Sequence, residues 1–124
     1  MWQKYNPNPC GKSIGDCAVR AVAVALDISW YDAFDLLAAE ARRVCDMPSS
    51  DAVWSTVLRR NGFTRAMIPN GCPSCYKAAD FCHEHPRGIF VLAFGGHVAT
   101  VRNGILLDNW DSSSETPIFY FREA

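Results

Sequence analysis

Residues 16–26 read DCAVRAVAVAL, and this stretch sets the centre of the architecture. Apart from Arg20 it is apolar from Ala18 to Leu26, so a helix formed here would be apolar on nearly every side. Such a helix lies in the interior of a protein rather than on its surface. Asp16 is a suitable N-cap residue for its first turn. We therefore predict a buried central helix that begins at Cys17.

Two further helices are predicted on the C-terminal side of this one, each opened by residues that cap helices, Ser29 and the run Ser-Ser-Asp at 49–51. The apolar residues predicted to face inward recur at three and four residues: Trp30, Phe34, Leu37, Ala38 and Ala41 in the first helix, and Val53, Trp54, Val57 and Leu58 in the second. Asn61-Gly62 is a typical helix stop. Residues 1–14 are rich in Asn, Pro and Gly, which indicates a loop.

The second half of the chain changes to the patterns of strands. Asn103-Gly104 separates two apolar runs, 97–102 and 105–110, and is a strong signal for a two-residue hairpin turn. Counting outward from this turn places Ala99 opposite Asp108 and His97 opposite Trp110. Strands are also predicted over 63–68, 89–94 and 117–122, with a short helix over 74–85. The predicted class is α+β, a single domain over 1–124, with N-terminal helices and a buried central helix on a C-terminal antiparallel sheet.

Composition and charge narrow the possible partners. Among the 124 residues, 12 basic and 13 acidic side chains give a net charge of −1, which offers no general attraction to nucleic acid or anionic lipid. The chain has no apolar run of about 20 residues and no signal-like segment after Met1. We therefore expect a cytoplasmic protein with no membrane or nucleic-acid partner, and its six cysteines as free thiols.

Three side chains suit one another chemically. Cys17 lies at a helix N-terminus, where the helix dipole favours the thiolate. His97 follows Gly95-Gly96 and can accept the thiol proton. Asp108 lies diagonal to His97 across the predicted hairpin, where it can hold the second ring nitrogen. Because the negative charge of Asp16 opposes a thiolate at Cys17, we also expect a cationic partner near the thiol.

The order of these residues resembles the papain-like cysteine peptidases. In that family a Cys heads a central helix, a His begins a later strand, and an acid or amide follows one strand on, often as Asn-x-Trp. Here the matching residues are Cys17, His97 and Asp108, and Trp110 corresponds to the Trp that covers the His pair. More narrowly, residues 15–21 (GDCAVRA), 96–98 (GHV) and 108–112 (DNWDS) resemble small papain-fold proteins of phages and gut bacteria. The resemblance spans about residue 8 to the C-terminus and implies a papain-like fold. It also implies that the protein acts in the cytoplasm, either of a bacterium or of the host of a phage that encodes it.

The chain departs from this family at one position. Papain-like enzymes place a Gln six residues before the nucleophile as an oxyanion donor, and here that position is Gly11. The nearest alternative donors are Gln3, Asn6, Asn8 and Lys12, of which we favour Asn8. The backbone N–H of Cys17 supplies one donor. Gly96 and Trp110 complete the predicted substrate-facing residues, since glycine leaves room for a substrate backbone.

Each of these residues also has an ordinary structural interpretation. A lone Cys17 would be a small buried residue, a lone His97 a structural histidine, and Trp110 part of the core. Asn109 or Asp111 remains an alternative to Asp108 as the third member.

A second group of cysteines and histidines offers up to five zinc-type ligands, at a spacing that no standard zinc motif has: Cys72, Cys75, Cys82, His83 and His85. The alternative is a helix with Tyr76, Ala79 and Cys82 inward.

Together these residues predict a thiol hydrolase. The expected reaction is attack on an amide or isopeptide bond of a peptide or protein substrate through a thioester, with no cofactor or metal. Two alternatives remain: an acyltransferase of the transglutaminase type with the same triad, and a non-catalytic binding module of the same fold, with or without zinc. The sequence leaves the substrate and the oligomeric state open.

Overall fold

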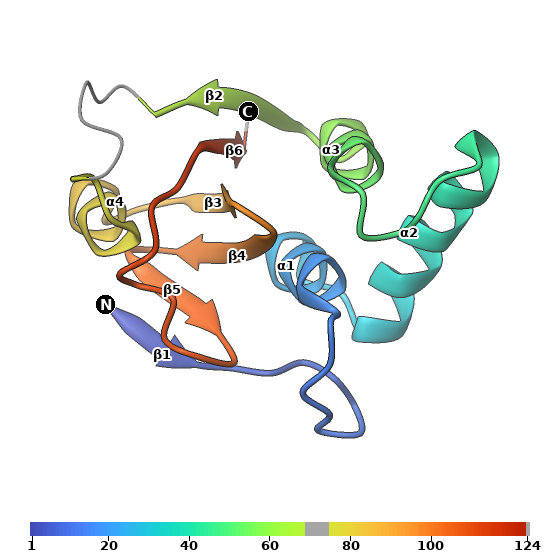
Figure 1. The fold of residues 1–124 in the computed structure, drawn as a ribbon, viewed down its shortest axis with the longest axis horizontal. Coiled ribbons are helices and arrows are strands. Elements are labelled where there is room, and N and C mark those ends of the chain that lie inside the picture. The colour runs from blue at the N-terminus through green and yellow to red at the C-terminus, as the bar shows by residue number, and fades with distance from the viewer. Residues whose placement is uncertain (69–74, 124) are drawn as a thin grey trace.

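The computed structural model describes residues 1–68 and 75–123, and these residues form four helices and six strands (Figure 1). The helices are α1 (Cys17–Leu26), α2 (Trp30–Val44), α3 (Asp51–Arg60) and α4 (Ala78–Glu84). The strands are β1 (Trp2–Lys4), β2 (Phe63–Met67), β3 (Ile89–Phe94), β4 (His97–Arg102), β5 (Ile105–Asp108) and β6 (Phe119–Glu123). The predicted α+β class is confirmed.

Helix α1 occupies the centre, as the sequence predicts. It begins at Cys17 and ends at Leu26, and its residues 18–25 are all buried. On one side it packs against β3 and β4, and on the other against α2 and α3 (Figure 1). The only charged side chain among the buried residues of this helix is that of Arg20. A charge in such a place requires a partner.

The six strands form one sheet in the order β1-β5-β4-β3-β6-β2. The prediction of a purely antiparallel C-terminal sheet is wrong, because β1 joins it beside β5 in a parallel arrangement, with Trp2 opposite Leu106. Residues 1–14 are therefore not all loop. A three-residue strand at the edge of a sheet has too little pattern to be recognised, and its pairing depends on a strand about 100 residues away.

Both faces of the sheet are covered. Val91 and Ala93 of β3 belong to the core shared with α1, α2 and α3, whereas Leu92 and Phe94 belong to a second core that includes Phe81 of α4. Successive side chains of a strand point to opposite faces, so a strand buried on both faces is apolar throughout. This explains the unbroken apolar run of β3.

The hairpin that carries the site has the predicted register. Arg102 pairs with Ile105 and Thr100 pairs with Leu107. Asn103 and Gly104 form the turn, both with positive φ, at 51° and 77°. A Cβ at Gly104 would lie 3.2 Å from the carbonyl oxygen of Cys82, so the turn requires glycine for its φ and for the space. Strand β5 ends at Asp108, two residues earlier than predicted.

The remaining elements differ from the predictions mainly at their ends. Ser29 caps α2, and the four predicted inner-face residues of α3 are buried. Phe34 of α2 is exposed, although it was predicted to face inward. Helix α4 is shorter than the predicted 74–85, and residue 74 lies outside the described residues. Within the described ranges, every helix is too short or too polar to cross a bilayer.

Candidate active site

Cys17 is the first residue of α1 and its side chain is half-buried. Its thiol lies beside the imidazole of His97 and the backbone of Val98, the first two residues of β4, and both favour the thiolate. Figure 1 shows β4 starting beside α1, which explains how residues 80 positions apart in the chain meet. The N-terminus of α1 and the start of β4 are therefore adjacent in the folded protein.

His97 follows the turn between β3 and β4, in which Gly95 and Gly96 connect the paired residues Phe94 and His97. Gly96 has a φ of +80°, and a Cβ at either glycine would have no neighbour within 4 Å. The ring nitrogen Nε2 of His97 lies 2.6 Å from Oδ2 of Asp108. Because Nε2 is engaged by the carboxylate, Nδ1 is the nitrogen left to exchange a proton with Cys17.

Asp108 is fully buried at the end of β5. Its Oδ2 accepts hydrogen bonds from His97 and, at 2.7 Å, from the hydroxyl of Ser112. Its backbone carbonyl accepts a 2.8 Å bond from the N–H of Tyr5 and a 3.3 Å bond from the indole of Trp2. The unpredicted strand β1 therefore helps to fix the position of the carboxylate.

The electrostatics favour a charged Cys17–His97 pair. Burial raises the pKa of Cys17, but the hydrogen bonds from His97 and Val98 and the charges of His97 and Arg20 outweigh it, and the net pKa is lowered. Burial lowers the pKa of His97, but its bonds to Asp108 and Cys17 and their charges raise the pKa to about 9. With one pKa lowered and the other raised, the thiolate–imidazolium form of the pair is favoured over the neutral form.

Arg20 is the cation that the sequence reasoning required but did not identify. Its Nη1 lies 2.8 Å from Oδ1 of Asp108 and its Nε lies 2.9 Å from Oδ1 of Asp16, and all three side chains are buried. A buried charge on an otherwise apolar helix was the signal that could have found it, because such a charge is retained only where it is paired. Ser112 was also missed as a partner of Asp108.

Asp16 precedes α1 as predicted, but its carboxylate does not cap the helix. Oδ2 instead accepts hydrogen bonds from the indole of Trp30 at 2.9 Å and from the amide of Asn8 at 3.2 Å, while Oδ1 faces Arg20. Burial raises the pKa of Asp16, but these bonds outweigh it and lower the pKa. The cap was mispredicted because a buried cation competes better for a carboxylate than a backbone N–H does.

Asn8, the predicted oxyanion donor, is buried and engaged in the loop before α1. Its oxygen accepts hydrogen bonds from the backbone N–H groups of Cys10 at 2.9 Å and Lys12 at 3.3 Å, and its amide nitrogen donates to Asp16. These contacts give Asn8 a positioning role, in which it connects the loop to the carboxylate beside the nucleophile.

Trp110 lies over the histidine, with its ring centroid 4.9 Å from that of His97. Phe94 stacks on the same imidazole at 5.8 Å. Trp110 itself is 44% exposed, so it is a cover for the site rather than part of the core. Together the two rings limit the access of water to the His97–Asp108 hydrogen bond.

The two alternatives to Asp108 have other partners. The side-chain nitrogen of Asn109 donates to Ser13 at 3.3 Å, and the carboxylate of Asp111 accepts bonds from Ser113. Of the three candidates, Asp108 is the one hydrogen-bonded to His97. The strand direction explains this, because Asp108 is the last residue of β5 that still lies in the hairpin.

The described members of the second cysteine and histidine group each have other contacts or surroundings. Cys75 is disulfide-bonded, so the expectation that all six cysteines are free is wrong. Disulfide pairing depends on the separation of Cα atoms, which sequence spacing alone does not give.

The ring of His85 stacks on that of Phe81. Cys82 is buried, whereas Ala79, which was predicted to face inward, is exposed. Cys72 lies outside the described residues. Within residues 1–68 and 75–123, no cluster of three or more His, Cys, Asp or Glu side chains could hold a metal ion.

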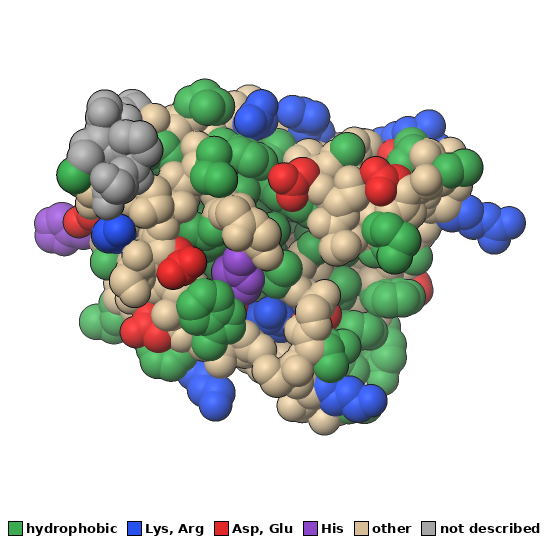
Figure 2. All heavy atoms as spheres, viewed as in Figure 1, with side chains coloured by type: hydrophobic (Ala, Val, Ile, Leu, Met, Phe, Trp, Pro, Cys, Tyr) green, Lys and Arg blue, Asp and Glu red, His purple; other side chains and the backbone are tan. Residues whose placement is uncertain are grey.

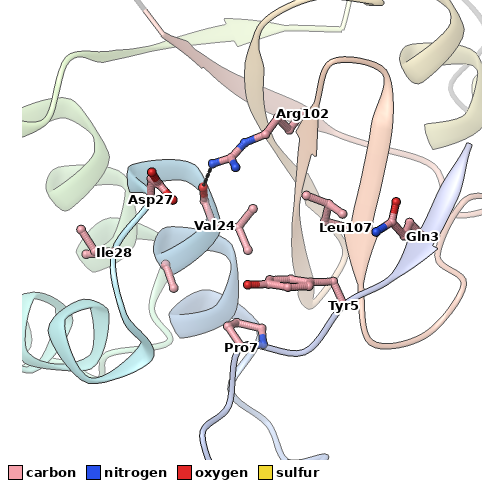
Figure 3. Close-up of a pocket in the computed structure, with 9 residues that line it drawn as sticks. Gln3, Tyr5, Pro7, Val24, Asp27, Ile28, Arg102 and Leu107 are labelled. Carbon is pink, nitrogen blue, oxygen red and sulfur yellow. Dashed lines mark hydrogen bonds between the residues drawn. The ribbon is translucent and has the colours of Figure 1, made fainter.

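A separate cavity lies at the other end of α1. It has a volume of about 260 Å³ and is lined by Tyr5, Val24, Asp27 and Arg102, among others (Figure 3). The guanidinium of Arg102 donates to the carbonyl oxygen of Val24, in the last turn of the helix. The same carbonyl accepts a 3.3 Å bond from the N–H of Asp27, so Arg102 is a second donor at the C-terminus of the helix and has a structural role.

No family model, no curated protein and no solved structure matches this chain.

Proposed function

We propose that the protein is a papain-like cysteine peptidase or amidase in which Cys17 is the nucleophile, His97 the general acid and base, and Asp108 the residue that orients His97. The observation that carries the proposal is the position of His97, which lies beside the Cys17 thiol and whose Nε2 is 2.6 Å from Oδ2 of the buried carboxylate of Asp108. The order of the three residues along the chain and the cover provided by Trp110 also fit that family.

The reaction follows from the geometry. The Cys17 thiolate attacks the carbonyl carbon of an amide, and the carbonyl electron pair moves to oxygen. When the C–N bond breaks, the His97 imidazolium gives its proton to the leaving amine, and a thioester remains. Water then attacks the thioester while His97 accepts a proton from it, and breakage of the C–S bond releases a carboxylic acid and returns Cys17 to its starting state.

The charge that develops on the carbonyl oxygen requires donors. The backbone N–H of Cys17 is in the first turn of α1, where N–H groups have no partner within the helix and the dipole favours negative charge. We assign the oxyanion to this N–H, because it belongs to the nucleophile itself and lies at the helix N-terminus. An oxyanion donor contributes about 3–4 kcal/mol to lowering the barrier.

The pH dependence of alkylation by iodoacetamide, mapped by mass spectrometry, tests the charged pair directly. Cys10 and Cys45 are exposed free thiols in the same chain and serve as internal references. We expect Cys17 to react with an apparent pKa below that of both references, and His97→Ala to raise it. His83→Ala, on the exposed face of α4, is the matched histidine control and leaves Cys17 unchanged.

Hydrolysis itself is tested with a mixture of peptides digested by wild type and by Cys17→Ala. Cleavage by wild type alone supports the peptidase. If Cys17 reacts no faster than Cys10 in wild type, or if His97→Ala leaves its pH dependence unchanged, the thiolate–imidazolium pair does not exist and the proposal fails.

A further inference from the structure

A second cleft begins at the residues on either side of the nucleophile. It has a volume of about 260 Å³, and its walls are the loop at 14–16, Ala18 and Val19 of α1, Trp30 and Phe34 of α2, and the segment 47–49. Asp16 and Ala18, which both line it, are the chain neighbours of Cys17, and consecutive Cα atoms are about 3.8 Å apart. An extended peptide advances about 3.3–3.6 Å per residue, so the cleft is within about one or two residues' reach of a substrate held at Cys17.

The lining is apolar. Trp30 and Phe34 stack with their ring centroids 5.2 Å apart and form one wall. The carboxylate of Asp16, the one charged group of the lining, is engaged by Arg20, Trp30 and Asn8. A guest in the cleft therefore meets aromatic and aliphatic surface with no free charge, which favours an apolar guest.

The cleft also exposes apolar side chains of a kind that folded proteins usually bury. Ile14, Phe34 and Met47 are 52%, 42% and 66% exposed, and all three line this one cleft. Figure 2 shows apolar side chains gathered over α2 and over the segment that joins α2 to α3. Apolar residues that gather at a concave site beside reactive groups mark a binding surface. Small-molecule pockets begin at about 300 Å³, so this volume suits a single side chain rather than a larger ligand.

We infer that this cleft binds one bulky apolar side chain of the substrate, next to the bond that Cys17 attacks, and that Phe34 and Met47 determine this preference. The inference rests on the proposed function and names its substrate class: peptide segments with an aromatic or large aliphatic residue beside the cleaved bond. Trp30 forms one wall with Phe34 and is held by its hydrogen bond to Asp16.

Two pairs of alkylating probes test the inference on both sides of the bond. On the acyl side, acetyl-Phe chloromethyl ketone is compared with acetyl-Gly chloromethyl ketone. On the amine side, N-benzyl chloroacetamide is compared with N-methyl chloroacetamide. In every case the Cys17 sulfur bonds to the probe's methylene carbon and chloride leaves. The measured quantity is the second-order rate constant of Cys17 modification, with iodoacetamide as the probe too small to use the cleft.

We expect the aromatic probe to react about tenfold faster than its partner in at least one pair, since apolar pockets discriminate by about 10–200-fold per group. Phe34→Ala and Met47→Ala each reduce this ratio severalfold and leave the iodoacetamide rate unchanged. Leu36→Ala is the matched control, because Leu36 is on the same helix with nearly the same exposure (41%) and does not line the cleft. It leaves the ratio unchanged.

The outcomes separate the inference from the proposed function. If Cys17 reacts rapidly with iodoacetamide but neither pair shows a preference, or if the preference survives both variants, the inference is overturned while the charged pair stands. If Phe34→Ala instead converts a dimer to a monomer and leaves the probe ratio unchanged, the cleft is a contact between copies and the inference is equally overturned. If iodoacetamide itself reacts no faster at Cys17 than at Cys10, the proposed function fails first.

Discussion

Arg20 offers a demanding test of the site, because it connects two buried carboxylates. Replacement by Met removes the cation but keeps an unbranched side chain of similar length. Asp16 and Asp108 then remain buried with one charge partner fewer, at positions where the present contacts are 2.9 Å and 2.8 Å. Removing one partner of a buried ion pair costs about 3–5 kcal/mol. The free energy of unfolding of a chain of 124 residues is about 6–19 kcal/mol, so this loss is a large part of it.

Urea unfolding followed by tryptophan fluorescence measures this loss. With a slope of about 1–3 kcal/mol/M, a loss of that size lowers the midpoint by roughly 2 M. The control is Arg43→Met, which removes a contact of the same length, 2.8 Å, to Glu40. The side chain of Arg43 is 60% exposed, and buried Glu40 keeps its 2.6 Å contact with Arg60 when Arg43 is replaced, so we expect a loss of about 0–1 kcal/mol. The reasoning is refuted if the two variants lose the same stability.

The same variant has a pH signature. Burial raises the pKa values of Asp16 and Asp108, but their hydrogen bonds and ion pairs, including those to Arg20, hold both below the ordinary 3.8. These carboxylates therefore stabilise the native protein above about pH 4, and the stabilisation is lost as pH falls through the lowered values. The difference between wild type and Arg20→Met is therefore largest at neutral pH and smaller near about pH 3. A difference that does not change with pH contradicts the ion-pair account.

Arg20 also acts on the nucleophile. Its charge is one of the causes that lower the pKa of Cys17. We expect the pH midpoint of Cys17 alkylation to rise in Arg20→Met and to return partly toward the wild-type value in Arg20→Lys. Lysine restores the charge but cannot contact both carboxylates as the guanidinium does. A merely structural role for Arg20 would not move this midpoint in the folded variant.

Three further predictions concern the triad and the hairpin. The plot of kcat/KM against pH should be bell-shaped, rising through the lowered pKa of Cys17 and falling near pH 9, where the imidazolium of His97 loses its proton; a profile that keeps rising above pH 9 contradicts His97 as the acid. Asp108→Asn keeps the shape of the side chain but removes the charge, so we expect kcat to fall about 10²–10⁴-fold and the alkaline limb to move to lower pH; an unshifted limb would show that Asp108 does not support His97. Gly104→Ala, strained by its φ of 77° and by the 3.2 Å contact, should lower the unfolding free energy by about 1–3 kcal/mol, whereas Gly15→Ala, with no neighbour within 4 Å, should change it little in the same urea titration.

Local patterns were sufficient for the parts of the fold that depend on neighbouring residues. The period of the apolar residues located α1, and the Asn103-Gly104 turn fixed the register of β4 against β5. That register alone predicts that Asp108 lies close to His97, because the alternation of side chains in a hairpin follows from counting residues.

Contacts between distant segments were not predictable in the same way. Strand β1 is three residues long, and its pairing with β5 depends on the edge that β5 leaves free. The direction of the Asp16 carboxylate was mispredicted because the choice between capping α1 and meeting Arg20 depends on what else is buried there. Sequence indicated that a cation was needed near Cys17, but not which one.

The α+β class, the central helix and the hairpin were predictable because they follow from periodicity and turn chemistry over a few residues. The start of β4 beside the first turn of α1, which brings His97 to Cys17, and the place of Arg20 between two carboxylates depend on the packing of distant segments. Desolvation explains this dependence, because a buried charge is stable only when it is paired with groups that lie close to it in the folded protein. Those neighbours come from distant segments, whose packing no local sequence pattern predicts.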